Sequence, residues 1–217
     1  MAHRGARRAV ALQTHAGVAL ALILCLQTQR LRAQLASYPA LIDEYQRRET
    51  EFPEHAIGWI EAAEKLMAML QLPDSTELAS LRGRILKVED NLASGEGSTV
   101  SRTTIRRARN AAAADSLERA ESVLRGRLLG AEERLKQFED KLCEGMTAFL
   151  LQNTLVPQGG GRQEWLLQVW AQFAQFPATR PLSLYLASAL AQVDRCFILD
   201  NVLQRVATLD RPHPPSD

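Results

Sequence analysis

The sequence predicts an all-α protein of elongated coiled-coil helices with a small helical module near its C-terminal end. Residues 103–155 contain no proline, and their apolar side chains recur at alternating steps of four and three residues, the spacing of a helix that packs against another helix. The composition agrees, because only 6% of the residues are aromatic while Ala, Leu, Gln, Glu and Arg dominate, a bias that favours helices over sheet. Clusters of proline and glycine divide the chain into successive helical segments.

The first segment, residues 1–52, has a basic start followed by 21 residues without a formal charge, Ala9–Gln29. This pattern is typical of a signal peptide or signal anchor. Its fully apolar part, Ala16–Leu26, is shorter than the roughly 20 apolar residues that a helix needs to cross a bilayer. Apolar residues keep a heptad-like spacing well beyond this run, which predicts one helix over residues 10–48 with a kink at Pro39. A buried assembly helix and a targeting or membrane segment are both open interpretations.

Residues 56–93 predict short helices and a first coiled-coil segment. Pro53 either ends the preceding helix or begins the next one, and an apolar face recurs over residues 56–70. A turn rich in small polar residues follows, and we expect Asp74 or Ser75 to act as the N-cap of another helix.

A flexible loop is predicted for residues 94–101, because they contain two glycines and three serines. It separates the apolar steps of three and four in residues 78–92 from the long helix that follows. Such a loop lets the two segments either fold back as a hairpin or follow one another along a partner.

The longest predicted helix covers residues 102–156 and would measure on the order of 75 Å at 1.5 Å per residue. A helix of that length cannot fold back on itself, so we expect its apolar seam to bind a helix of another chain. Two tryptophans of the C-terminal module are expected to make a second contact. The residues predicted to bind a partner are Leu117, Leu124, Leu128, Leu135, Phe138, Leu142, Phe149, Trp165 and Trp170.

A proline and three glycines in residues 157–161 mark the clearest boundary in the chain. Residues 162–209 then predict a small helical module, with an aromatic-rich helix that ends before Pro177 and a further helix that begins near Pro181. A module of this size is marginal alone, so we expect it to pack on a partner. Residues 210–217 are predicted to be a disordered tail.

No residue pattern points to catalysis, a cofactor or a metal, and we predict that the protein is not an enzyme. The histidines are isolated, and the chain has no HExxH, no zinc-type CxxC pair and no GxSxG. The glycines at 159–161 lack the remainder of a phosphate-binding loop, so we interpret them as a linker. Three widely spaced cysteines, Cys25, Cys143 and Cys196, are typical of a reducing compartment and of buried apolar positions.

One basic cluster is a candidate for nucleic-acid contact. It consists of Arg102, Arg106, Arg107 and Arg109. No acidic residue lies between Glu96 and Asp115, and three of the arginines share one helical face, a geometry suited to phosphates. The alternative interpretation is a solvated basic start of the coiled coil, or a surface that pairs with an acidic partner. The net charge of +1 gives no global reason to expect nucleic acid or membrane.

An apolar N-terminal helix, broken coiled coils and a terminal helical module follow one another along the chain. The stretches that carry this order are Leu20–Leu26 with Leu31–Leu35, Lys141–Cys143 with Ala148–Leu150 and Val156-Pro157, and Glu164–Leu167, Phe176-Pro177, Leu199–Leu209 and Arg211–Pro214. In this order the sequence resembles the centromere protein K family, which are inner-kinetochore subunits. The resemblance implies pairing with centromere protein H in a multi-subunit complex on centromeric chromatin, a nuclear location, and no catalytic residues.

We therefore expect a non-enzymatic coiled-coil subunit of a protein assembly, most like a kinetochore component that acts in chromosome segregation. One alternative is a membrane-anchored coiled-coil envelope protein with Ala9–Gln29 as its signal anchor. A coiled-coil subunit of another cytoskeletal or tethering complex shares the same physics, because heptads specify that helices pair more clearly than with which partner.

Overall fold

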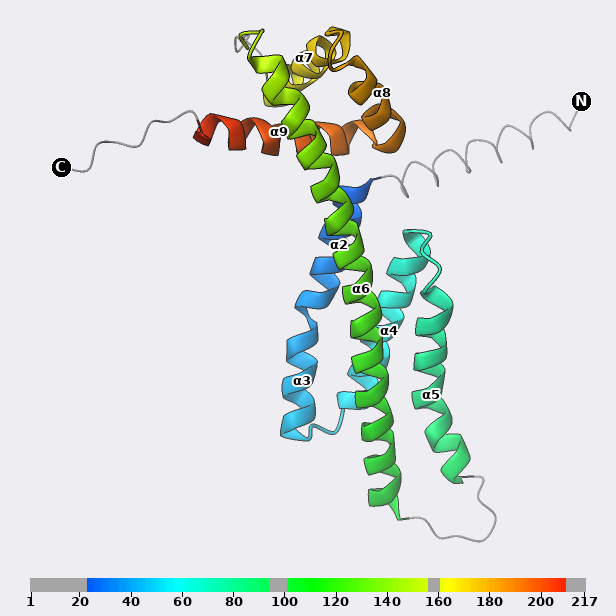
Figure 1. Cartoon of the computed structure of the whole chain (residues 1–217). Helices are drawn as coiled ribbons and strands as arrows, with labels where there is room; N and C mark the ends of the chain where they lie inside the picture. The colour runs from blue at the N-terminus through cyan, green and yellow to red at the C-terminus, as the bar shows by residue number, and fades with distance from the viewer. Residues whose placement is uncertain (1–22, 94–100, 156–160, 210–217) are drawn as a thin grey trace, which may run out of the picture. The chain divides into compact units, whose positions relative to one another are not determined.

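The computed structural model describes residues 23–93, 101–155 and 161–209, and the regular secondary structure within these ranges is entirely helical (Figure 1). The predicted all-α class is therefore confirmed. The helices are α2 (Leu24–Ala36), α3 (Tyr38–Arg47), α4 (Phe52–Met69), α5 (Ser75–Ala93), α6 (Arg102–Leu150), α7 (Arg162–Gln175), α8 (Arg180–Ala189) and α9 (Gln192–Leu209). The predicted loop of residues 94–101, apart from Ser101, and the predicted tail of residues 210–217 lie outside the described residues.

The chain folds into two compact units. Residues 27–93 and 101–130 form the first, called the bundle below. Residues 131–155 and 161–209, together with residues 23–26, form the second, called the C-terminal unit. The first part of α6 belongs to the bundle and the remainder to the C-terminal unit, so each part of this helix meets a different set of neighbours.

In the bundle, α5 and α6 run in opposite directions. Arg84 of α5 pairs with Asp115 of α6 at 3.2 Å. Arg127, farther along α6, donates to both carboxylate oxygens of Asp74, just before α5, at 2.5 and 2.8 Å. Because residue numbers rise along α6 as they fall along α5, the two helices form a hairpin. The sequence left open whether these two segments fold back as a hairpin or follow one another along a partner, and the structure shows the hairpin.

Helix α4 is antiparallel to both of its sequence neighbours. It has Pro53 in its first turn, as expected if that proline begins a helix rather than ending one. Arg82 of α5 pairs with Glu64 at 3.1 Å, and His55 at the opposite end of α4 contacts Glu44 of α3 at 2.8 Å. From α3 to α6, successive helices therefore alternate in direction, as in an up-and-down bundle.

The prediction of one helix over residues 10–48 is wrong for its described part, because α2 and α3 are separate helices with Ser37 between them. Pro39 lies in the first turn of α3, where its missing N–H has no intrahelical acceptor to lose. The Ser37 hydroxyl donates to the carbonyl oxygen of Gln34 at 2.8 Å and accepts from Nε1 of Trp59 at 3.0 Å. The break is thus held by side-chain hydrogen bonds rather than left as a simple kink.

A single hydrophobic core holds the bundle together, with side chains from each of its helices. Its largest members are Leu31, Leu41, Phe52, Trp59, Ile60, Met67, Leu78, Leu81, Ile85, Leu117 and Leu124. Burying one such side chain contributes about 1.5–3 kcal/mol to the free energy of folding. The apolar seam of the first part of α6 is therefore covered by α2–α5 of the same chain.

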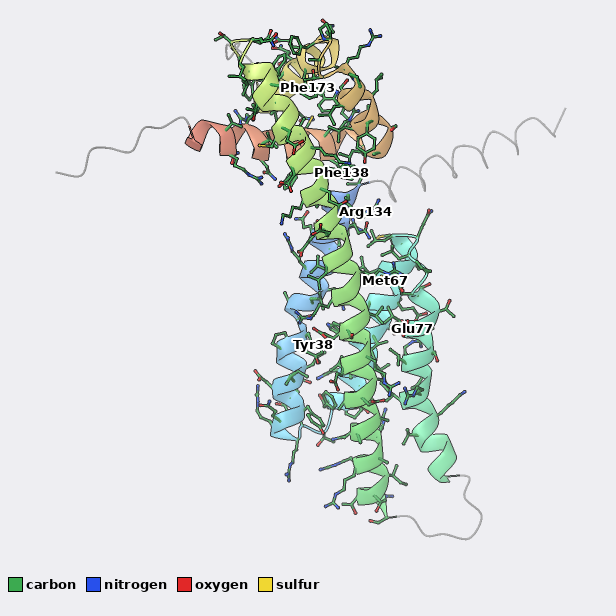
Figure 2. The ribbon with its side chains drawn as sticks, in the orientation of Figure 1. Tyr38, Met67, Glu77, Arg134, Phe138 and Phe173 are labelled. Carbon is green, nitrogen blue, oxygen red and sulfur yellow. The ribbon has the colours of Figure 1, made fainter. Side chains whose placement is uncertain are left out.

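The C-terminal unit packs α7, α8 and α9 around the last turns of α6, and its core is rich in aromatic rings. Phe149 of α6 meets Phe173 of α7 edge to face, with ring centroids 6.0 Å apart, and Phe176 at 5.6 Å. Figure 2 shows Phe138 on α6 and Phe173 on α7. The predicted module of residues 162–209 corresponds to α7–α9, and it packs on a helix of its own chain.

Candidate functional site

The residues predicted to bind a partner through the bundle part of α6 lie inside the protein. Leu117 and Leu124 are completely buried in the bundle core, and Leu128 is partly buried against it. The expectation that this ridge stays open until another chain covers it is wrong here, because α2–α5 supply the covering helices. Partner binding through these side chains stays a prediction and would require the bundle to open.

The corresponding residues in the C-terminal unit are covered in the same way. Leu142 and Phe149 are 1% exposed, and Leu135 and Phe138 pack against the same core while remaining partly exposed. The structure thus divides the predicted seam between two intramolecular cores. The heptad spacing identified the buried face of α6 correctly but does not specify which chain buries it.

The two tryptophans predicted to make a second contact are partly buried and are covered by arginines. The guanidinium of Arg162 lies 4.5 Å from the ring centroid of Trp165, and that of Arg195 lies 5.1 Å from Trp170. Trp165 also lines a groove of about 530 Å³ between the ends of α6 and α9 and the start of α7. A partner contact through either ring stays a prediction.

The predicted basic cluster is divided by the fold. Arg109 pairs with Glu54 of α4 at 2.6 Å, and its side chain is only 20% exposed. Arg102, Arg106 and Arg107 are exposed. Because one of the four cations is held by a carboxylate of the bundle, the cluster is not the uninterrupted phosphate-binding face that the sequence suggests.

A cleft of about 240 Å³ lies where these arginines meet the α3–α4 corner. Its lining residues are Thr50, Pro53, Glu54, Arg102, Ile105, Arg106, Arg109 and Asn110. Arg107 is not among them. The cleft combines three guanidinium groups, one carboxylate, one hydroxyl and one side-chain amide, with a small apolar wall. Sequence spacing alone could not place Thr50 and Glu54 beside the arginines, because 48 or more positions separate them in the chain.

A buried carboxylate in the C-terminal unit is the other unusual polar feature. Asp194, in the first turn of α9, is completely buried and accepts hydrogen bonds from the backbone N–H groups of Leu24 and Cys25, at 2.7 and 3.0 Å. These are the first amides of α2, which have no acceptor within their own helix. Burial, together with the hydrogen bond and the negative charge of Asp194, raises the pKa of the Cys25 thiol well above its usual range. Asp194 therefore caps α2 from 170 residues away.

Large apolar side chains are exposed on the outer faces of α8 and α9. Leu184 is 63% exposed, Val193 60% and Phe197 49%. Val193 and Phe197 are four residues apart and so lie on the same face of α9. The sequence predicted a small helical module that packs on a partner but did not distinguish these three residues from the other apolar residues of the module.

The described residues also bear on metal binding and on the predicted anchor. Among them, no group of three His, Cys, Asp or Glu side chains is arranged to hold a metal ion. None of the helices within 23–93, 101–155 and 161–209 combines the length and the apolar character of a membrane-spanning segment. Most of Ala9–Gln29 lies outside these ranges, while two of its described residues, Leu24 and Thr28, are buried.

No family model, no curated protein and no solved structure matches this chain. The resemblance to the centromere protein K family therefore stays a prediction that rests on the residues quoted for it.

Proposed function

We propose that this chain is a non-enzymatic helical subunit of a protein assembly and that its C-terminal unit carries the docking face. The observation that supports the proposal is the exposure of Leu184, Val193 and Phe197 on α8 and α9. Single exposed leucines are ordinary on protein surfaces. Three large apolar side chains, each about half exposed or more, on two successive helices of one small unit are better explained by a partner that removes them from water.

The charged side chains of both units fit a scaffold role. Arg127 with Asp74 in the bundle, and Arg205 with Glu139 in the C-terminal unit at 2.9 Å, join helices that are far apart in sequence. Such pairs orient helices against one another, which suits a scaffold. Leu184, Val193 and Phe197, in contrast, leave about half or more of their side-chain surface exposed to solvent.

The proposal is tested by affinity purification of the whole chain from its native cells, with identification of the bound proteins. We expect Leu184→Asp and Phe197→Asp to lose a specific partner that the unsubstituted chain retains. A charge placed in an interface core must be desolvated, which should weaken binding by roughly a hundred-fold or more.

Leu86→Asp is the matched control, because Leu86 is 45% exposed on α5 of the bundle. It should retain the partner. The proposal fails if the unsubstituted chain is recovered alone, or if the substitutions on α5, α8 and α9 have the same effect.

The most specific form of the proposal is an inner-kinetochore subunit that pairs with a centromere protein H-like helix. Its support is the resemblance in sequence. A centromere protein H-like chain among the recovered partners, together with salt-extractable association with chromatin, is the expected outcome. Carbonate-resistant association with membranes would instead favour the interpretation of Ala9–Gln29 as a signal anchor.

A further inference from the structure

The start of α6 carries positive charge that the described part of the chain does not balance. Arg102 and Arg106 are exposed, line the 240 Å³ cleft and have no ion-pair partner among the described residues. They are four residues apart on one helix, so their like charges repel each other. The first turn of α6 contains no acidic residue, and the positive end of its macrodipole adds to the repulsion. An anion bound in the cleft would weaken both the repulsion between the two arginines and their repulsion from the positive end of the helix.

The third arginine of the cleft is held in place by the bundle. The ion pair between Nη1 of Arg109 and Oε1 of Glu54 measures 2.6 Å, and the Arg109 side chain is only 20% exposed. The pair restricts the Arg109 guanidinium, so less conformational entropy remains to be lost when a ligand binds. With one carboxylate against three guanidinium groups, the cleft retains two formal positive charges.

Uncharged groups of the cleft can also donate hydrogen bonds to an anion. The side-chain amide of Asn110 lines the cleft, and its Nδ2 group is a hydrogen-bond donor. The Thr50 hydroxyl is a second neutral donor, while Pro53 and Ile105 supply apolar wall for a carbon substituent.

We propose that this cleft is a binding site for a phosphate monoester. A monoester carries close to two negative charges at neutral pH and three strong acceptor oxygens, which match the two net positive charges and the several donors of the cleft. A carboxylate would neutralise only one charge and offers fewer acceptors. The site lies in the bundle and uses none of the residues on α8 and α9, so its test is independent of the proposed docking function.

The same charges have a competing interpretation, in which the arginines follow the backbone of a nucleic acid. The two interpretations differ in the role of Arg107. This residue is exposed and belongs to the same basic stretch, but it does not line the cleft. A cleft for one phosphate group excludes it, whereas a surface that attracts phosphates along the helix includes it.

The test is calorimetric titration of the full chain, at low salt, with a short phosphoserine peptide and with inorganic phosphate, against the unphosphorylated peptide. We expect the two phosphate probes to bind and the unphosphorylated peptide not to bind. Arg102→Gln and Arg106→Gln should each weaken binding by about ten-fold or more, because each removes charge-assisted hydrogen bonds. Arg107→Gln removes the same charge from the same stretch of helix and should change the dissociation constant by less than about two-fold.

The substitutions lie at exposed positions, so all variants are expected to keep the helical circular dichroism of the unsubstituted chain. The proposal is overturned if neither phosphate probe binds to the unsubstituted chain. It is also overturned if Arg107→Gln weakens binding as much as Arg106→Gln does. The nucleic-acid interpretation would be established instead by a single-stranded oligonucleotide that binds the unsubstituted chain more tightly than the phosphopeptide does. In that case all three variants should bind the oligonucleotide with equally reduced affinity.

Discussion

At the scale of single residues, Gly145 shows how closely α7 and α8 approach α6. A Cβ atom on Gly145 would lie 2.6 Å from Cδ2 of Leu182 and 3.1 Å from Cζ of Phe173. The Leu182 side chain is partly buried and can give way, but Phe173 is completely buried and cannot move without disturbing the aromatic core. Absence of a side chain at this position is therefore a packing requirement of the C-terminal unit.

We expect Gly145→Ala to lower the free energy of unfolding by about 1–3 kcal/mol through overpacking. Gly126→Ala on the same helix is the control, because a Cβ there meets nothing within 4 Å. It should instead raise the stability by about 0.5–1 kcal/mol, since alanine is the better helix former. Urea unfolding of both variants measures the two effects, and a Gly145→Ala variant as stable as Gly126→Ala would contradict the close packing.

At the scale of elements, the start of α2 depends on a residue of α9. The Asp194 carboxylate is close to the positive ends of both helices, which favours a negative charge at a site that burial would otherwise make unfavourable. An N-cap is usually the residue just before its helix. Here the cap comes from the opposite end of the sequence, so α2 can begin correctly only when the C-terminal unit has folded.

We expect Asp194→Asn to release the first turn of α2 and to lower the free energy of unfolding by about 1–3 kcal/mol, because an amide offers one acceptor where the carboxylate offers two. The local readout is the rate at which Cys25 reacts with a thiol reagent in a Cys143→Ser, Cys196→Ser background. Burial and the Asp194 charge raise the pKa of the Cys25 thiol, so little thiolate is present at neutral pH. The reaction should become faster in Asp194→Asn, because the loss of the negative charge and of burial lowers the pKa of the Cys25 thiol.

Asp200→Asn is the control for that experiment, because Asp200 lies on the same helix but pairs with Arg162. It should leave the reactivity of Cys25 unchanged. Equal reaction rates in Asp194→Asn and in the parent would contradict the capping role.

At the scale of the whole molecule, each unit covers its own part of α6. Leu117 in the bundle and Leu142 in the C-terminal unit are both buried by helices of the same chain. The predicted need for a second chain to complete this helix is replaced by intramolecular packing. The exposed apolar side chains of α8 and α9 are the surface that we propose for a partner instead.

We therefore expect the isolated chain to unfold at a temperature that does not depend on protein concentration over a roughly hundred-fold range, since no association is needed to complete the cores. Leu117→Ala should lower the free energy of unfolding by about 2–5 kcal/mol in the absence of any partner. Leu129→Ala, at a 58% exposed position of the same helix, is the control and should have little effect. A midpoint that rises with concentration would indicate that another chain covers α6.

Several features of the fold follow from local sequence patterns. The absence of proline and the apolar spacing in residues 103–155 predict α6, which spans Arg102–Leu150. The turn before Ser75 and the boundary before Arg162 predict where α5 and α7 begin. These are local properties, because periodicity, proline and turn chemistry act within a few residues.

Only the tertiary structure decided what those helices contact. The pairing of Arg109 with Glu54, the capping of α2 by Asp194 and the covering of Leu117 by α2–α5 each join residues separated by tens to more than a hundred positions. An apolar seam is stable only when it is removed from water. The hydrophobic free energy gained per unit of buried apolar area is the same whether helices of its own chain or of another chain cover it. The sequence by itself therefore determined which surfaces are apolar and which segments are helical, whereas the packing of distant helices decided which apolar surfaces and which charges remain available to a partner.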